Sequence, residues 1–264
     1  MKILVIGDPH GDLQGIRKIN LNGLDLILLT GDLGSANLMR KMHFENVTRT
    51  QQGLPEIEHS SREKKRAFME AYDSTMKLIK YLSSFHAEIF TVFGNVENSN
   101  AETRKISKEI GLHLPFLYDE LRKRNVRVLN NVIANFHGVR IGGVEYFVDS
   151  NWVREFKPSD YREQLASARV QTMKAKRVLK NFGDVDILLC HQPPYGILDG
   201  VNFKGAPKHW RGKHAGSPVI LDYIKRNQPQ YVFCGHIPEG EGMKKVGRTE
   251  VYNLGVGGFK FIEL

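Results

Sequence analysis

MKILVIGDPHGD, residues 1–12, starts with a short apolar run over residues 2–6 and then turns at once to polar residues. An apolar run of this length, rich in β-branched side chains, is typical of a strand buried on both faces of a parallel sheet. Asp8 and His10 come directly after it, at the position where open α/β sheets bind their ligands. Asp-Pro and Gly-Asp are also common turn formers, so this stretch alone indicates a turn as readily as a binding site.

The same arrangement recurs after four further apolar runs, which span residues 26–30, 89–93, 186–190 and 231–234. Each run is followed, directly or after one glycine, by a residue type that ligates metals. Together the five runs present a set of such side chains: Asp8, His10, Asp32, Asn95, His191 and His236. Independent turns would seldom place these residue types so consistently, so the pattern favours one shared metal site over five ordinary turns.

Taken in order, these blocks resemble the motif blocks of the calcineurin-like metallophosphoesterases. The blocks are Gly7-Asp8-Pro9-His10-Gly11, Gly31-Asp32, Gly94-Asn95, His191 and Gly235-His236. The resemblance implies an α/β fold, the calcineurin-like four-layer α-β-β-α sandwich with two mixed β-sheets. Because dividing the chain would divide the ligand set, we expect a single metallophosphoesterase domain over residues 1–264. We expect it to carry an inserted loop-helix region at about 35–85 and a lid loop at about 199–217.

The resemblance also implies a dinuclear metal site. The first metal would be held by Asp8, His10 and Asp32, and the second by Asp32, Asn95, His191 and His236. Mixed His, Asp and Asn ligation suits Mn²⁺, our first choice, or Fe, Ni or Zn, better than Ca²⁺ or Mg²⁺. Two such cations neutralise phosphoryl oxygens and supply a metal-activated hydroxide, so the resemblance predicts a hydrolase that cleaves phosphoester bonds. Glu97 is assigned to the catalytic set with Asp32, as a support of the Asn95 loop through hydrogen bonds.

Two positions depart from the usual motifs of the family. Val96 stands where the third block usually has the histidine that donates a proton to the leaving group. Pro238 stands where the last block usually has a metal-ligating histidine. We therefore expect weakened activity and a weaker first metal site, in which water, substrate, Glu239 or Glu241 fills the vacancy. General acid catalysis is typically worth about 10²–10⁴-fold, so we expect Val96→His to restore activity mainly on poor leaving groups.

Segment 199–217 combines glycines, cations and aromatic side chains, and it begins shortly after His191. Cations hold phosphate oxygens, and an aromatic ring stacks on a base or covers a leaving group. We interpret this segment as a substrate lid rather than an ordinary polar loop. The predicted substrate-binding residues are Asn95, Lys208, Trp210, Arg211 and Lys213. His209 and His214 are candidate catalytic acids in place of the histidine that Val96 replaces.

Lysine and arginine outnumber aspartate and glutamate by 38 to 29, which gives a formal net charge of +9. This excess suggests an anionic substrate or partner, although charges spread over a basic surface explain the total more simply. Nucleic acid is an alternative partner if the basic helix expected at 161–182 faces the site. The charge alone does not identify it.

Cys190 and Cys234 each close an apolar run, which indicates buried thiols and fits a reducing compartment. The apolar stretch at the N-terminus is too short for a signal peptide or a membrane span. We therefore expect a cytoplasmic protein that does not act at a membrane. The family resemblance implies a phosphoester small molecule or nucleotide as its partner. The sequence predicts no oligomeric state.

Two interpretations of the function stay open. The first is a metallophosphoesterase with a phosphodiester or nucleotide-like substrate, a preference that rests on the basic, aromatic lid. The second is a degenerate family member that binds a metal, a nucleotide or a partner protein without useful turnover. Val96 and Pro238 favour the second interpretation, and the six retained ligand residues oppose it.

Local patterns predict the remaining elements. Helical periodicity predicts helices over residues 62–85 and 161–182, and a serine-proline start signal predicts another over 218–226. Residues 35–62 have no regular pattern and are expected to include a long surface loop at 49–61. Residues 126–148 alternate between apolar and polar and suggest a second, antiparallel sheet, after which a loop is expected to begin at 151–152.

Overall fold

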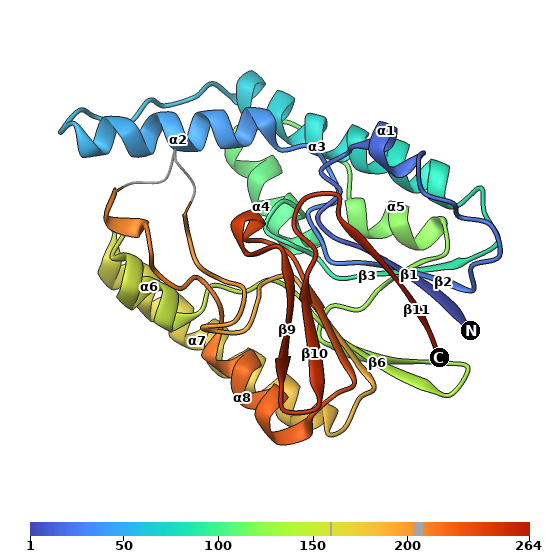
Figure 1. The fold of residues 1–264 in the computed structure, drawn as a ribbon. Helices are drawn as coiled ribbons and strands as arrows, with labels where there is room; N and C mark the ends of the chain where they lie inside the picture. The colour runs from blue at the N-terminus through green and yellow to red at the C-terminus, as the bar shows by residue number, and fades with distance from the viewer. Residues whose placement is uncertain (159, 203–207) are drawn as a thin grey trace.

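Two β-sheets face each other in the computed structural model, and helices cover the outer face of each sheet (Figure 1). The structure describes residues 1–158, 160–202 and 208–264. The predicted four-layer α-β-β-α sandwich with two mixed sheets is confirmed. Within the described ranges, no helix combines the length and the apolar character that crossing a bilayer requires.

The first sheet contains the first three apolar runs of the sequence. Its order is β11-β1-β2-β3-β4, with β1 to β4 parallel and β11 antiparallel to β1. The strands are β1 (Lys2–Ile6), β2 (Leu26–Leu29), β3 (Glu88–Thr91), β4 (Val126–Val128) and β11 (Phe259–Glu263). Every residue of β2 is buried, as expected for a strand that is covered on both faces.

The second sheet has the order β5-β6-β7-β8-β10-β9, in which the edge strands β5 and β9 are antiparallel and the others parallel. The strands are β5 (Val132–Phe136), β6 (Val139–Val144), β7 (Ile187–Cys190), β8 (Tyr231–Cys234), β9 (Gly242–Val246) and β10 (Thr249–Asn253). The antiparallel sheet expected over 126–148 is confirmed only for the β5–β6 hairpin. The rest of that prediction is wrong, because β4 joins the first sheet and β6 ends at Val144.

Helices bury apolar side chains against both sheets. Residues of α1, α3 and α5 pack on the first sheet, and residues of α7 and α8 pack on the second. The helices are α1 (Leu13–Ile16), α3 (Ser61–Leu82), α4 (Asn100–Ile110), α5 (Leu117–Lys123), α7 (Tyr161–Phe182) and α8 (Pro218–Asn227). Between the sheets, Val5 and Phe90 from the first share a core with Phe233 from the second. The predicted helices at 62–85, 161–182 and 218–226 are confirmed within a few residues.

Two helices lie where the sequence indicated irregular structure. The first, α2 (Asn37–Gln51), occupies most of the irregular region expected at 35–62 and has no buried residue. It has no apolar face to produce a periodic pattern, which explains why the sequence did not predict it. The second, α6 (Ser150–Phe156), replaces the loop expected at 151–152 and begins where the Asp149 side chain accepts a hydrogen bond from the Asn151 backbone.

Candidate metal centre

The six predicted ligand residues lie in loops that follow five parallel strands. These strands are β1, β2 and β3 of the first sheet and β7 and β8 of the second. The loops meet at the carboxyl ends of both sheets, although Asp8 and His236 are 228 residues apart in the chain. Asp8, Asp32 and His191 are buried there. The fold therefore brings these six side chains together. In the sequence, the one feature that they share is a position just after a strand.

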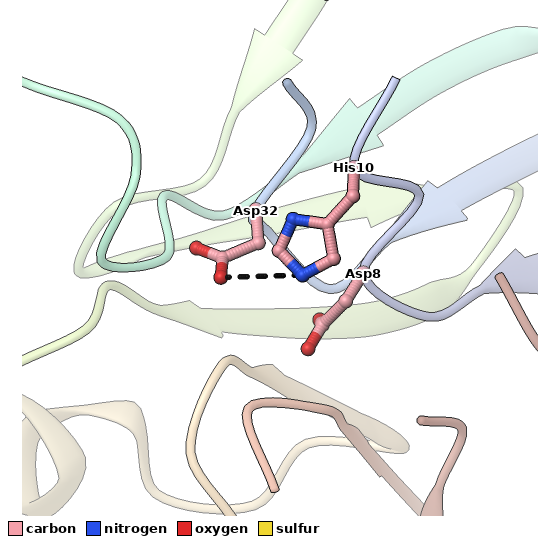
Figure 2. Close-up of side chains that lie close together, drawn as sticks. All are labelled: Asp8, His10 and Asp32. Carbon is pink, nitrogen blue, oxygen red and sulfur yellow. Dashed lines mark ion pairs between the residues drawn. The ribbon is translucent and has the colours of Figure 1, made fainter. Parts of the chain in front are cut away.

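Asp8, His10 and Asp32 form the first cluster of the site. One potential ligand atom of each lies within 4.8 Å of the others, and His10 Nε2 is 3.8 Å from Asp32 Oδ2 (Figure 2). The Thr30 hydroxyl donates to Asp8 Oδ1 at 2.8 Å, and the His236 backbone N–H donates to Asp8 Oδ2 at 2.5 Å. These bonds fix the Asp8 carboxylate. One imidazole and two carboxylates are a donor set that fits a divalent transition metal.

Donor atoms of four residues form a second cluster that shares Asp32. His191 Nε2 lies 3.0 Å from Asn95 Oδ1 and 3.5 Å from Asp32 Oδ1. His236 Nδ1 lies 2.9 Å from Asn95 Oδ1 and 3.1 Å from His191 Nε2. The Thr30 carbonyl, 3.0 Å from His191 Nδ1, can only accept a hydrogen bond, so Nδ1 carries a hydrogen and Nε2 faces the cluster. The donor atoms of Asn95, His191 and His236 lie within 3.1 Å of one another and are of the types that a divalent transition metal takes, and Asp32 joins them through His191.

Burial shifts the protonation of these side chains. It raises the pKa of Asp8 to about 6 and lowers the pKa of His236 to about 3, so the His236 imidazole is neutral. It also raises the pKa of Glu97 to about 7, and the nearby charge of Asp32 adds to that shift. Carboxylates gathered in a buried site repel one another and lose hydration. A bound cation would offset both costs, which supports the fit of this site to metals.

The ligand loops adopt backbone conformations that residues other than glycine rarely take. The φ angle is +42° at His10, +46° at Asp32 and +66° at His236. Such conformations cost about 1–3 kcal/mol each, and they cluster at functional sites. Gly94 and Gly235 complete the loops, because a Cβ at these positions would collide with the carboxylates of Asp32 and Asp8, respectively.

Glu97 connects the loop that carries Asp32 to the loop that carries Asn95. Its carboxylate accepts hydrogen bonds from the backbone N–H groups of Asp32 at 3.0 Å, Leu33 at 2.7 Å and Gly94 at 2.8 Å. It is 8% exposed, so these bonds are made away from bulk water. The Glu97 carboxylate is therefore directed at backbone donors of both loops.

Val96, the first departure from the family motif, lies in an apolar cluster. It is 5% exposed and groups with Ala36 and Ala71, and Met39 packs against them. Its backbone N–H donates to Asp32 Oδ1 at 3.0 Å, so the main chain supports the Asp32 carboxylate. The start of α2 and the middle of α3 therefore surround the side chain that replaces the usual histidine.

Pro238, the second departure, begins the short 3₁₀ helix η2 (Pro238–Gly240) and is exposed. Over the described ranges, Asp8, His10 and Asp32 are the only acidic, histidine or cysteine side chains, in a group of three or more, that each have a ligand atom within 4.8 Å of all the others, whereas Asp32 is joined to the second cluster through His191. Neither Glu239 nor Glu241 joins that group, so of the four alternatives for the missing ligand, water, substrate, Glu239 and Glu241, the two glutamates lie outside the cluster. The Glu241 carboxylate instead lies against Gly255.

The candidate lid residues contact α6 and one another. The Trp210 ring, in the short helix η1 (Lys208–Trp210), lies 5.4 Å from that of Phe156, and the Lys213 ammonium donates to the Glu155 carbonyl at 2.5 Å. His214 Nδ1 is 2.7 Å from Asp199 Oδ1. Lys208, His209 and Arg211 are exposed. Residues 203–207 of the lid lie outside the described residues, and the contacts made by the rest tie it to α6.

Sequence reasoning missed Arg40 and Tyr146. Arg40 Nη2, on α2, lies 2.8 Å from His10 Nε2. The Tyr146 ring centroid lies 5.7 Å from that of His191 and 5.1 Å from that of His236. Burial raises the pKa of Tyr146 to about 12, so its hydroxyl stays protonated. Neither residue stands beside a motif, so no sequence signal identifies them.

A groove of about 510 Å³ begins at the Asn95 loop and extends to α7. Its lining includes Asn98, Asn131 and Tyr146, and Lys174 supplies a cation from α7. The Lys174 ammonium donates to Glu145 Oε1 at 2.9 Å. The groove therefore offers amide, hydroxyl and charged groups next to a candidate metal ligand.

Comparisons with known proteins agree with this architecture. The family model for calcineurin-like phosphoesterases matches residues 1–240. No protein in a curated set matches the chain significantly. One solved structure is 20% identical, with a TM-score of 0.62, over 99% of this chain and 94% of its own. The phosphopantetheinyl hydrolase of Mycobacterium tuberculosis is 12% identical, with a TM-score of 0.54, over 97% of this chain and 89% of its own. A dimetal phosphatase from Danio rerio is 10% identical, with a TM-score of 0.54, over 98% of this chain and 88% of its own. At these identities, the solved structures show the fold alone.

Proposed function

The chain belongs to the calcineurin-like phosphoesterase family, and on that premise we propose that it is a metal-dependent phosphohydrolase with a phosphodiester or nucleotide-like substrate. One observation carries the proposal. Asn95 Oδ1, His191 Nε2 and His236 Nδ1, which come from both sheets, lie within 3.1 Å of one another. A core alone does not require such atoms to face one another, whereas a cation does.

We propose two divalent cations, with Mn²⁺ as the first choice and Fe, Ni or Zn as alternatives. The first would be held by Asp8, His10 and Asp32, and the second by Asp32, Asn95, His191 and His236. When bound, such cations offset the charge of phosphoryl oxygens and acidify water. Because Pro238 offers no ligand atom, we propose that the first cation binds more weakly than the second.

The protein's own residues would orient the reacting groups. Glu97 holds the loops of Asp32 and Asn95 in register through backbone hydrogen bonds. Val96 has no proton to give, so the leaving group needs a different acid. We propose His209 or His214 of the lid for that role. Asp199 orients the His214 ring through Nδ1, which leaves Nε2 available for proton transfer.

Substrate contact is proposed for two places, the lid and the groove. The lid contributes Lys208, Trp210, Arg211 and Lys213, whose cations suit phosphate oxygens. The groove has a volume of about 510 Å³, inside the range of about 300–1,000 Å³ that is typical of small-molecule sites. Its amide groups and the Lys174 ammonium suit a polar leaving group such as a nucleoside.

Blocking the groove tests this placement of the leaving group. Lys174→Trp fills the groove at an exposed helix position, and Lys176→Trp, two residues on along α7, is the matched control. We expect Lys174→Trp to raise KM about ten-fold, or ~1.4 kcal/mol, for a nucleoside aryl phosphodiester and less for a small aryl monoester. If both variants change KM equally, the leaving group does not occupy the groove.

Hydrolysis of activated aryl phosphate mono- and diesters tests the function itself. We expect the Mn²⁺-loaded protein to turn over both classes and to prefer the diester. Stoichiometric metal binding without turnover would instead favour the second candidate, a non-catalytic protein that binds a metal, a nucleotide or a partner. Val96 and Pro238 are the observations that favour that candidate.

Two further proposals concern the surroundings of the protein. A nucleic acid substrate requires the basic helix α7 to face the site, and Lys174 of α7 lines the groove. Retention on DNA or RNA that weakens steeply with salt would support a nucleic acid substrate.

Cys190 and Cys234 are buried free thiols, which supports a reducing compartment, and we propose the cytoplasm.

A further inference from the structure

The Arg40 side chain reaches the first ligand cluster from helix α2. Its Nη2 lies 2.8 Å from His10 Nε2, the ring nitrogen that also faces Asp32. A guanidinium donates hydrogen bonds and cannot accept them, so His10 Nε2 is the acceptor. Arg40 thereby places a permanent positive charge at the edge of a cluster that contains two buried carboxylates.

The turn that carries Arg40 is anchored, although α2 as a whole has no buried residue. The Glu70 carboxylate of α3 accepts hydrogen bonds from the Leu38 backbone at 2.8 Å and from the Ser35 hydroxyl at 3.3 Å. Met39 packs against the apolar cluster that contains Val96. Arg40 comes next in the chain, so its guanidinium extends from a fixed backbone to the ligand cluster.

The bond between Arg40 and His10 competes with metal binding. The Nε2 lone pair of His10 serves one partner at a time, so a cation bound there would displace the guanidinium. Arg40 is exposed, so packing does not hold its long side chain against His10. Guanidinium groups present parallel N–H donors that match phosphoryl oxygens.

We infer that Arg40 binds the nonbridging oxygens of the substrate's phosphoryl group, an inference that rests on the proposed function. Arg40 is then a substrate-binding residue contributed by α2, outside the motif blocks. A phosphate monoester has one more nonbridging oxygen than a diester and carries more negative charge. The contribution of Arg40 is therefore greater for monoesters, and for orthophosphate as a product, than for diesters.

Orthophosphate binding tests the inference directly. The variants are Arg40→Ala and Arg40→Lys, with Lys41→Ala as the control because Lys41 is the next exposed cation on the same helix. In the Mn²⁺-loaded protein, we expect Arg40→Ala to raise the Kd of orthophosphate about 10–100-fold, the effect of one charged hydrogen bond. Arg40→Lys keeps the positive charge but lacks the parallel N–H donors of the guanidinium, so it should recover part of the lost orthophosphate affinity. Lys41→Ala should bind orthophosphate like the wild type.

Mn²⁺ affinity, measured without phosphate, separates this role from a structural one. Removal of Arg40 removes both a positive charge and a competitor for His10 Nε2, so Arg40→Ala should bind Mn²⁺ at least as tightly as the wild type. An unchanged orthophosphate Kd would overturn the inference. A loss of Mn²⁺ affinity equal to the loss of phosphate affinity would overturn it too, because Arg40 would then support the metal site.

These results do not depend on turnover. If the wild type hydrolyses phosphoesters while Arg40→Ala binds orthophosphate normally, the role of Arg40 is wrong and the proposed function stands. If orthophosphate binding depends on Arg40 but no phosphoester is hydrolysed, Arg40 is a phosphate-binding residue and the proposed hydrolase function fails.

Discussion

Glu97 joins two of the candidate ligand loops through three backbone hydrogen bonds. One carboxylate oxygen accepts from the N–H groups of Asp32 and Gly94, and the other accepts from that of Leu33. Glu97→Gln preserves the size of the side chain but leaves at least one of these donors without an acceptor. We expect the free energy of unfolding of the metal-free protein to fall by about 1–3 kcal/mol, as measured by urea denaturation in EDTA.

Glu102→Gln is the matched control for this substitution. Glu102 accepts from the backbone and the hydroxyl of Ser99 in the capping box of α4, where a glutamine serves as well. Its effect on unfolding should stay within about 0.5 kcal/mol. An equal loss in both variants would contradict the role of Glu97 as the support of the ligand loops.

The meeting of the candidate ligand residues is predictable at this scale because each one lies just past the end of an apolar strand. Asn95 and His191 meet although 96 residues separate them, since both strands end at the same edge of the sandwich. Arg40 and Tyr146 are not predictable. Their closeness to the site depends on the course of α2 and of the segment after β6, and neither is marked by a pattern in the sequence.

At the scale of elements, α2 and α3 determine the surroundings of Val96. Val96→His would place an imidazole among apolar side chains of both helices, which should cost about 1–3 kcal/mol of stability. It also returns an acid to the position from which the family usually protonates the leaving group. We expect activity to rise mainly for aryl phosphates with poor leaving groups, and rates across a series of leaving-group pKa values would measure this.

Val96→Asn is the control that separates the two effects of Val96→His, the added acid and the added polarity. It brings a polar group into the same apolar cluster but has no proton to transfer near neutral pH. We expect it to lose stability without a gain on poor leaving groups. A gain from Val96→His that is equal for all leaving groups would contradict the account.

Elements with a strong periodic pattern are predictable, and those without one are not. The apolar face of α3 recurs at helical spacing and packs on the first sheet, so its sequence indicates a helix clearly. The α2 helix has no buried face to create such a pattern. The alternation of residues 126–148 indicates strands but cannot show that β4 pairs with β3 rather than with β5.

At the scale of the whole molecule, the two sheets contribute different shares of the metal site. We propose four protein ligands for the cation of the second cluster, which joins residues of both sheets, and three for that of the first, because Pro238 offers no ligand atom. After exhaustive dialysis in metal-free buffer, elemental analysis should find about one Mn²⁺ per chain, and Pro238→His should raise the retained amount toward two. Two ions that the wild type retains equally well would contradict the difference between the sites.

The sequence indicates five strands that end at one ligand site, and the family resemblance adds that these strands form two facing sheets. Hydrophobic periodicity alone does not distinguish one sheet from two, because every such run is buried on both faces in either arrangement. The course of the lid is not predictable, since it depends on packing between Trp210 and Phe156, which are distant in sequence.

Metal-dependent hydrolysis is the measurement that tests the central claim most directly. The protein would be stripped of metal, reloaded with Mn²⁺ and assayed with activated aryl phosphate mono- and diesters, with Asp32→Ala in parallel. Because Asp32 belongs to both clusters, we expect turnover only after reloading, and none in Asp32→Ala. Turnover that survives metal removal or the loss of Asp32 would contradict the account, as would stoichiometric metal binding without any turnover.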